Sequence, residues 1–179
     1  MTQVYAIALG SKDPQEKTAG LNVAFYFLKA DAAGLFQELL ASSGGNETFQ
    51  QRLINEITGT DTPEAVDLLV QTVQKLMDQW RKKHPQGTIV KPQTAPDYEE
   101  KTGAMLITTL RQIENPKTLP AFRKLLDNKE PDFRLSAVEA LGKMGEKEDI
   151  LLLENMLKKE TDDYLQQSIR GAIKSINNR

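Results

Sequence analysis

The chain has 179 residues, of which 39% are hydrophobic and 27% are charged, and this is the composition of a globular protein rather than of a disordered segment. The formal net charge of −2 excludes a strong overall attraction to nucleic acid or to anionic membranes. The lack of cysteine excludes disulfides, thiolate chemistry and cysteine-ligated metals, and no apolar run approaches the roughly 20 residues that cross a bilayer.

The first predicted element is a short apolar helix over residues 2–9, paired with a helix over 14–29. It is too short for a signal peptide and lacks the basic flank of one. We therefore expect the chain to begin inside a repeat and to be part of a longer protein. The uncapped helix would expose apolar surface, which favours a homodimer through its side chains Val4, Tyr5, Ile7 and Leu9.

Further helices follow, separated by short polar turns, and no strand pattern interrupts them. Two start signals stand out, Thr62-Pro63 and Asn115-Pro116, since each places a capping side chain before a proline that suits a first helical turn. The remaining predicted pairs are 31–42 with 46–58, 63–83 with 97–113, 116–126 with 131–144, and 147–158 with 162–176.

The last two pairs repeat each other. At a constant offset of 32 residues, four positions match: Ser136, Ala140, Leu141 and Met144 against Ser168, Ala172, Ile173 and Ile176. A period in this range is typical of stacked helical repeats. Glycine is unfavourable inside a helix, so Gly20, Gly103 and Gly171 are expected to lie under a crossing backbone.

Residues 115–145 carry a resemblance to the HEAT repeat, in the short HEAT-like form also found in phycobilisome lyases. The matching residues are Asn115-Pro116, Leu119-Pro120, Phe122, Leu125-Leu126, Pro131-Asp132, Phe133-Arg134, Ala137, Ala140-Leu141-Gly142 and Met144-Gly145. The resemblance implies an all-α fold: a right-handed α–α solenoid (superhelix) of about five HEAT-like hairpins, in a single bacterial domain over 1–179. Such families mostly bind proteins on the concave face of the second helices; some relatives are chromophore lyases, and one branch excises alkylated DNA bases.

The third pair breaks the period with a long first helix and an insertion over 84–96 that contains three prolines. Trp80, the only tryptophan, stands beside Arg81 and Lys82, and an aromatic residue among cations can anchor a partner peptide. The structural alternative is that Trp80 packs along its own helix while the cations favour the helix dipole.

Three basic residues of the second helices are further candidates for partner binding on the concave face, namely Lys101, Arg134 and Arg170. Arg134 also has a structural interpretation. In such repeats this arginine often pairs with an acidic residue that opens a neighbouring helix, and Asp132 and Asp163 are available for that role.

Nucleic-acid binding is not expected, because the aligned concave positions Lys17, Glu47, Arg134 and Gln166 form no basic stripe. No catalytic residue, metal site or cofactor is predicted either. His84 is the only histidine and has no predictable orienting partner. The acidic pairs Glu99-Glu100 and Asp162-Asp163 are ordinary helix starts.

The sequence therefore predicts a non-catalytic scaffold that binds a protein or peptide, on its concave face or at the 80–96 insertion. The alternative is a HEAT-like enzyme of the chromophore lyase or DNA glycosylase type. The compartment stays open: cytoplasmic, or periplasmic or secreted if an N-terminal signal has been removed.

Overall fold

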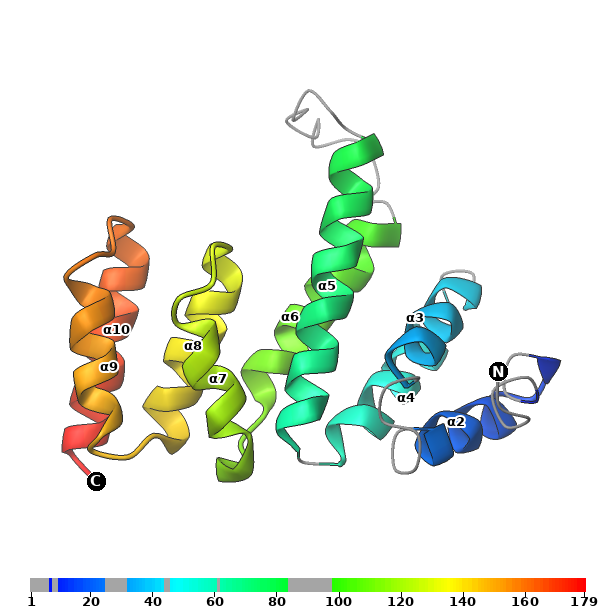
Figure 1. Ribbon diagram of the computed structural model, residues 1–179, viewed down its shortest axis with the longest axis horizontal. Coiled ribbons are helices and arrows are strands. Elements are labelled where there is room, and N and C mark those ends of the chain that lie inside the picture. The colour runs from blue at the N-terminus through cyan, green and yellow to red at the C-terminus, as the bar shows by residue number, and fades with distance from the viewer. Residues whose placement is uncertain (1–6, 8–9, 25–31, 44–45, 61, 84–97) are drawn as a thin grey trace. The chain divides into compact units, whose positions relative to one another are not determined.

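The fold is an all-α solenoid of helical hairpins, seen in a computed structural model that describes residues 7, 10–24, 32–43, 46–60, 62–83 and 98–179 (Figure 1). Over these ranges there is no strand. The elements are α2 (Pro14–Val23), α3 (Ala32–Ser42), α4 (Glu47–Thr58), α5 (Pro63–Lys83), α6 (Tyr98–Gln112), the 3₁₀ turn η2 (Pro116–Thr118), α7 (Leu119–Leu125), α8 (Pro131–Met144), α9 (Asp149–Leu157) and α10 (Asp163–Asn177).

The helix starts are where polar side chains and prolines predict them. Before α5, Thr62 Oγ1 accepts a hydrogen bond from the backbone N–H of Ala65. Asn115 accepts from the N–H of Lys117 at 2.9 Å, so Asn115-Pro116 does open a helical segment, first as η2 and then as α7. These bonds satisfy N–H groups that the first turn leaves without a partner.

The chain divides into two compact units, the first comprising Met1–Thr60 with Gln71–Gly103 and the second Asp61–Val70 with Ala104–Arg179. In the first unit, α2 packs on α3 and α4, and α3 packs on α4. Its buried core is almost wholly aliphatic and includes Leu21, Leu35, Phe36, Leu39, Leu53, Ile54 and Ile57. The single domain and the handedness of the array stay predictions.

In the second unit, α7 packs on α8, and α10 packs on both α8 and α9. The second helices α8 and α10 approach closely at one glycine, since a Cβ at Gly142 would lie 3.1 Å from the Cβ of Ala172. The expectation for Gly103 and Gly171 was wrong: a Cβ at either would meet nothing within 4 Å. A close crossing needs small residues on the face between two second helices, and Gly142 and Ala172 lie on that face.

Corresponding faces of α8 and α10 differ in polarity. On α8, Leu135 and Val138 are buried and lie on the same stripe as Gly142, which contacts α10. Thirty-two positions later, α10 carries exposed polar residues instead, namely Gln167, Arg170 and Lys174. The outer face of α10, defined by these three residues, is therefore polar where the matching face of α8 is apolar.

Candidate functional site

The last turn of α5 holds three of the predicted binding residues. The predicted helix 63–83 agrees with the observed bounds, and it ends in Arg81, Lys82 and Lys83, all of which are exposed. Trp80 is half-buried. Arg81 Nη1 lies 3.4 Å from Asp78 Oδ1, in a pair whose side chains are both about half exposed, so the pair contributes little to stability. Cations at this end of a helix are favoured by its dipole.

Lys101 lies in the same unit, near the start of α6. Its Nζ is 3.7 Å from Glu47 Oε1, and both side chains are largely exposed. This weak ion pair leaves the Lys101 side chain accessible to a partner.

Arg134 has a structural role in the first turn of α8. Its Nε donates to Glu160 Oε2 at 3.0 Å, its Nη1 donates to the carbonyl oxygens of Asn128 and Lys129, and its side chain is only 18% exposed. The carboxylate is that of Glu160, which precedes α10, and not that of Asp132 or Asp163. The sequence could not identify it, because Glu160 lies outside the helix that it helps to position.

Two other arginines connect neighbouring repeats in the same way. Arg111, at the end of α6, has its Nη2 3.0 Å from Asp132 Oδ1 on α8. Arg123 on α7 donates to both carboxylate oxygens of Asp149, the first residue of α9, at 2.6 and 3.0 Å. Each pair joins one helix to the corresponding helix of the next hairpin.

Asp149 is the most enclosed carboxylate of this series, with its side chain 2% exposed. Burial raises the pKa of Asp149, but the hydrogen bonds from Arg123 and from the backbone N–H of Glu146 outweigh that effect and hold the pKa below its ordinary value. The Asp149 carboxylate is therefore held in its charged form and paired with Arg123 across two hairpins.

Arg170 is exposed on the outer face of α10, at the position that corresponds to the buried Val138. The six predicted residues are thus divided. Trp80, Arg81, Lys82 and Lys101 belong to the first unit, whereas Arg134 and Arg170 belong to the second.

Several predicted features lie outside the described residues: the insertion 84–96 with His84, and Val4, Tyr5 and Leu9 of the first helix. Ile7 is described and is 60% exposed. In the described ranges, no three or more histidine or acidic side chains are grouped as metal ligands would be. Every helix found there is too short or too polar to span a bilayer.

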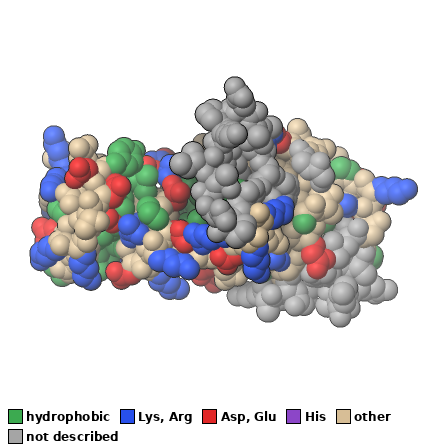
Figure 2. Space-filling view, turned by 90° about the horizontal axis from the view of Figure 1, so that it is seen from above, with side chains coloured by type: hydrophobic (Ala, Val, Ile, Leu, Met, Phe, Trp, Pro, Cys, Tyr) green, Lys and Arg blue, Asp and Glu red, His purple; other side chains and the backbone are tan. Residues whose placement is uncertain are grey.

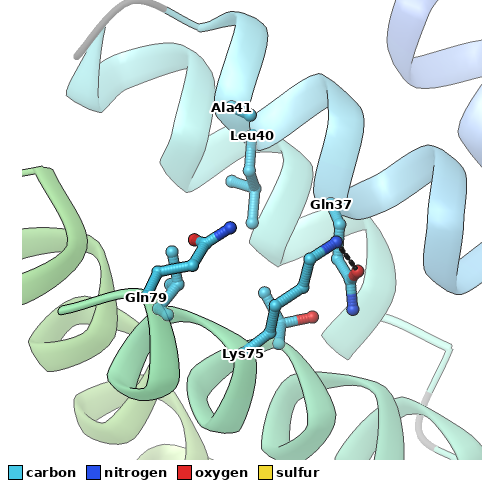
Figure 3. A pocket seen from close by; sticks show the side chains of 7 residues that line it. Gln37, Leu40, Ala41, Lys75 and Gln79 are labelled. Carbon is cyan, nitrogen blue, oxygen red and sulfur yellow. Dashed lines mark hydrogen bonds between the residues drawn. The ribbon is translucent and has the colours of Figure 1, made fainter. Parts of the chain in front are cut away.

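One feature of the first unit was not predicted. Between α3 and α5 there is a hollow of about 60 Å³, here called the α3–α5 hollow, whose lining includes Gln37, Leu40, Ala41, Lys75, Leu76 and Gln79 (Figure 3). Figure 3 shows Leu40 pointing down between Lys75 and Gln79. The lining residues on α3 and those on α5 are 31 to 42 positions apart in sequence, so periodicity within either helix could not reveal the hollow.

Residues 92–174, from α6 to α10, match the family model for HEAT repeats. This segment of the chain carries HEAT repeats. HEAT and related repeats generally serve as protein-interaction scaffolds and are generally non-catalytic. No curated protein matches the sequence.

Two solved structures are similar to the chain along almost its whole length. One is an engineered protein from a structural genomics consortium, 14% identical, with 99% of this chain and 98% of that chain covered and a TM-score of 0.32. The other is a designed armadillo repeat protein, 18% identical, with 98% and 99% covered and a TM-score of 0.29.

Proposed function

We propose that this chain is a non-catalytic protein-interaction module that binds an acidic segment of a partner protein at the end of α5. The supporting observation is the last turn of that helix, where the half-buried Trp80 adjoins the exposed cations Arg81 and Lys82. Tryptophan and arginine are enriched among the residues that dominate binding energy in protein interfaces. The cations would speed encounter with an acidic partner, and Trp80 would supply contact area.

The second helices of the second unit are a less favourable place for such a partner. Arg134 is enclosed and paired, Arg111 lies beside Asp132, and Lys143 Nζ is 2.9 Å from Glu114 Oε1. Figure 2 shows basic and acidic side chains interspersed over the described part of that view, without a continuous basic band. A surface with charges balanced in this way also lacks the continuous basic stripe with which a protein follows a nucleic-acid backbone. We therefore propose a protein partner.

The proposal is tested by charge reversal at two matched helix ends. The double variant Arg81→Glu/Lys82→Glu alters the end of α5, and Lys158→Glu/Lys159→Glu alters an equally exposed pair of cations after α9. A partner would first be captured with the tagged chain, identified, and then titrated against purified variants. We expect the α5 variant to weaken binding at least about tenfold and the α9 variant to leave it within about twofold.

Trp80 offers an independent measurement, because it is the only tryptophan. With a partner that lacks tryptophan, the emission of Trp80 should shift on binding. Equal weakening by both charge reversals, with no change in Trp80 emission, would refute this site. Crosslinks from the partner to α8 and α10 alone would place binding on the second helices instead.

A further inference from the structure

The α3–α5 hollow lies beside the cations that the proposed function uses. Resting on that function, we propose that the hollow receives one aliphatic side chain of the acidic partner segment, while an acidic residue about three positions away contacts Lys82. The hollow and Lys82 both belong to the first unit, so the position of one relative to the other is defined.

The interior of the hollow suits an apolar group of limited size. Its inner wall is formed by the buried side chains of Leu40 and Leu76, and Ala41 stands at its edge. The volume of about 60 Å³ is well below the ~150 Å³ of an apolar cavity that binds benzene. An aliphatic side chain such as valine therefore fits better than phenylalanine or tryptophan.

The rim gives the site its charge preference. Lys75 is the one ionisable residue in the described lining, and its Nζ donates to the neutral side-chain oxygen of Gln37 at 2.7 Å. The positive charge of Lys75 is therefore not neutralised by this contact, and Gln79 adds an exposed amide to the same rim. A partner segment with carboxylates would find complementary charge as its apolar residue enters.

The spacing along α5 defines the register. Lys75, Gln79 and Lys82 are four and three residues apart, so they form one exposed stripe that leads from the hollow to the helix end. At 1.5 Å per residue, Lys75 and Lys82 are roughly 10 Å apart along the axis. An extended peptide advances about 3.3–3.6 Å per residue. Three peptide residues therefore cover the distance from the hollow to Lys82.

The experiment is a selection of phage-displayed random peptides on the full chain, followed by fluorescence anisotropy with the selected peptides. We expect enrichment of an aliphatic residue with an acidic residue about three positions away. The variant Ala41→Trp should fill the hollow and weaken these peptides about tenfold. Ala19→Trp, the same change at an exposed position of α2, should leave them unchanged. Gln79→Trp fills the hollow from the other helix and serves as a second variant, with circular dichroism to check helix content.

The outcomes separate this inference from the proposed function. If selected peptides lose affinity with Arg81→Glu/Lys82→Glu but bind both hollow-filling variants normally, the hollow is not the anchor and the α5 site stands. If the peptides prefer large aromatic residues at the anchor position, the inference is also overturned. If no peptide depends on Arg81 and Lys82, both the proposed function and this inference are wrong.

Discussion

Replacing Arg123 with methionine should destabilise the second unit more than any change of an exposed charge. Methionine keeps much of the apolar stem but removes the two N–H groups that donate to Asp149. The Asp149 carboxylate, 2% exposed, is left with the backbone N–H of Glu146 at 2.8 Å as the remaining donor of the three. A buried carboxylate with too few donors is costly, because it has lost its water without a full replacement.

The expected magnitude follows from the geometry. Removal of one partner from a buried ion pair costs about 3–5 kcal/mol. The lower part of that range applies here, because Arg123 is one-third exposed and one donor to Asp149 remains. We expect about 3 kcal/mol, which for a chain of this size corresponds to a decrease in Tm of roughly 6–12 °C.

The pH dependence gives a second, independent signature. In the wild type the pKa of Asp149 is lowered in the folded state, so this stabilisation is present above the unfolded pKa of about 3.9 and is lost as pH falls through the folded value. In Arg123→Met, burial acts without the guanidinium and raises the folded pKa above about 3.9. The deficit of the variant should therefore shrink as pH falls from 7 towards 4.

Urea unfolding followed by circular dichroism at several pH values measures both quantities. Lys124→Met, at the exposed neighbouring position, is the control and should change stability by no more than about 0.5 kcal/mol. The double variant Arg123→Met/Asp149→Leu should recover part of the lost stability, since it removes the buried carboxylate that Arg123→Met leaves unpaired. A loss below about 1 kcal/mol for Arg123→Met, or a deficit independent of pH, would refute the reasoning.

Two further predictions concern the same unit. Gly171→Ala should stabilise the protein by about 0.5–1 kcal/mol, because a Cβ there meets open space. Gly142→Ala should be destabilising, because its Cβ would press on Ala172 of α10. Thermal unfolding of the two variants tests this pair, and equal shifts in Tm would contradict the close crossing. Burial raises the pKa of Glu160, but hydrogen bonds from the backbone N–H groups of Asp162 and Thr161 and the charge of Arg134 hold it below its ordinary value, so its stabilisation is lost as pH falls below about 4.3. Glu160→Gln should therefore flatten the loss of stability between pH 5 and 3, and urea midpoints that fall as steeply as those of the wild type would count against this role.

Local sequence signals predicted the helices well because each depends on neighbours along the chain. Thr62-Pro63 and Asn115-Pro116 open helical segments as expected, and the bounds 63–83 and 131–144 agree with α5 and α8. These signals are capping groups and apolar periodicity, which act within one or two turns.

The interactions between hairpins could not be predicted in the same way. Arg123 and Asp149 are 26 residues apart, and so are Arg134 and Glu160. That shared spacing is a signal, but it acquires meaning only once the stacking of one hairpin on the next is known. The basic end of α5 was predicted from its residues alone, whereas the α3–α5 hollow required the two helices to be brought together.

The polar outer face of α10 sets the conditions for lengthening the array by design. A hairpin appended there would have to bury Gln167, Arg170 and Lys174, and two of these are charges without a prepared partner. Exchanging the three for leucine, valine and glycine would reproduce the face that α8 offers to α10. In an otherwise unchanged chain, the same exchange would create an exposed apolar surface through which copies could associate end to end into a fibre.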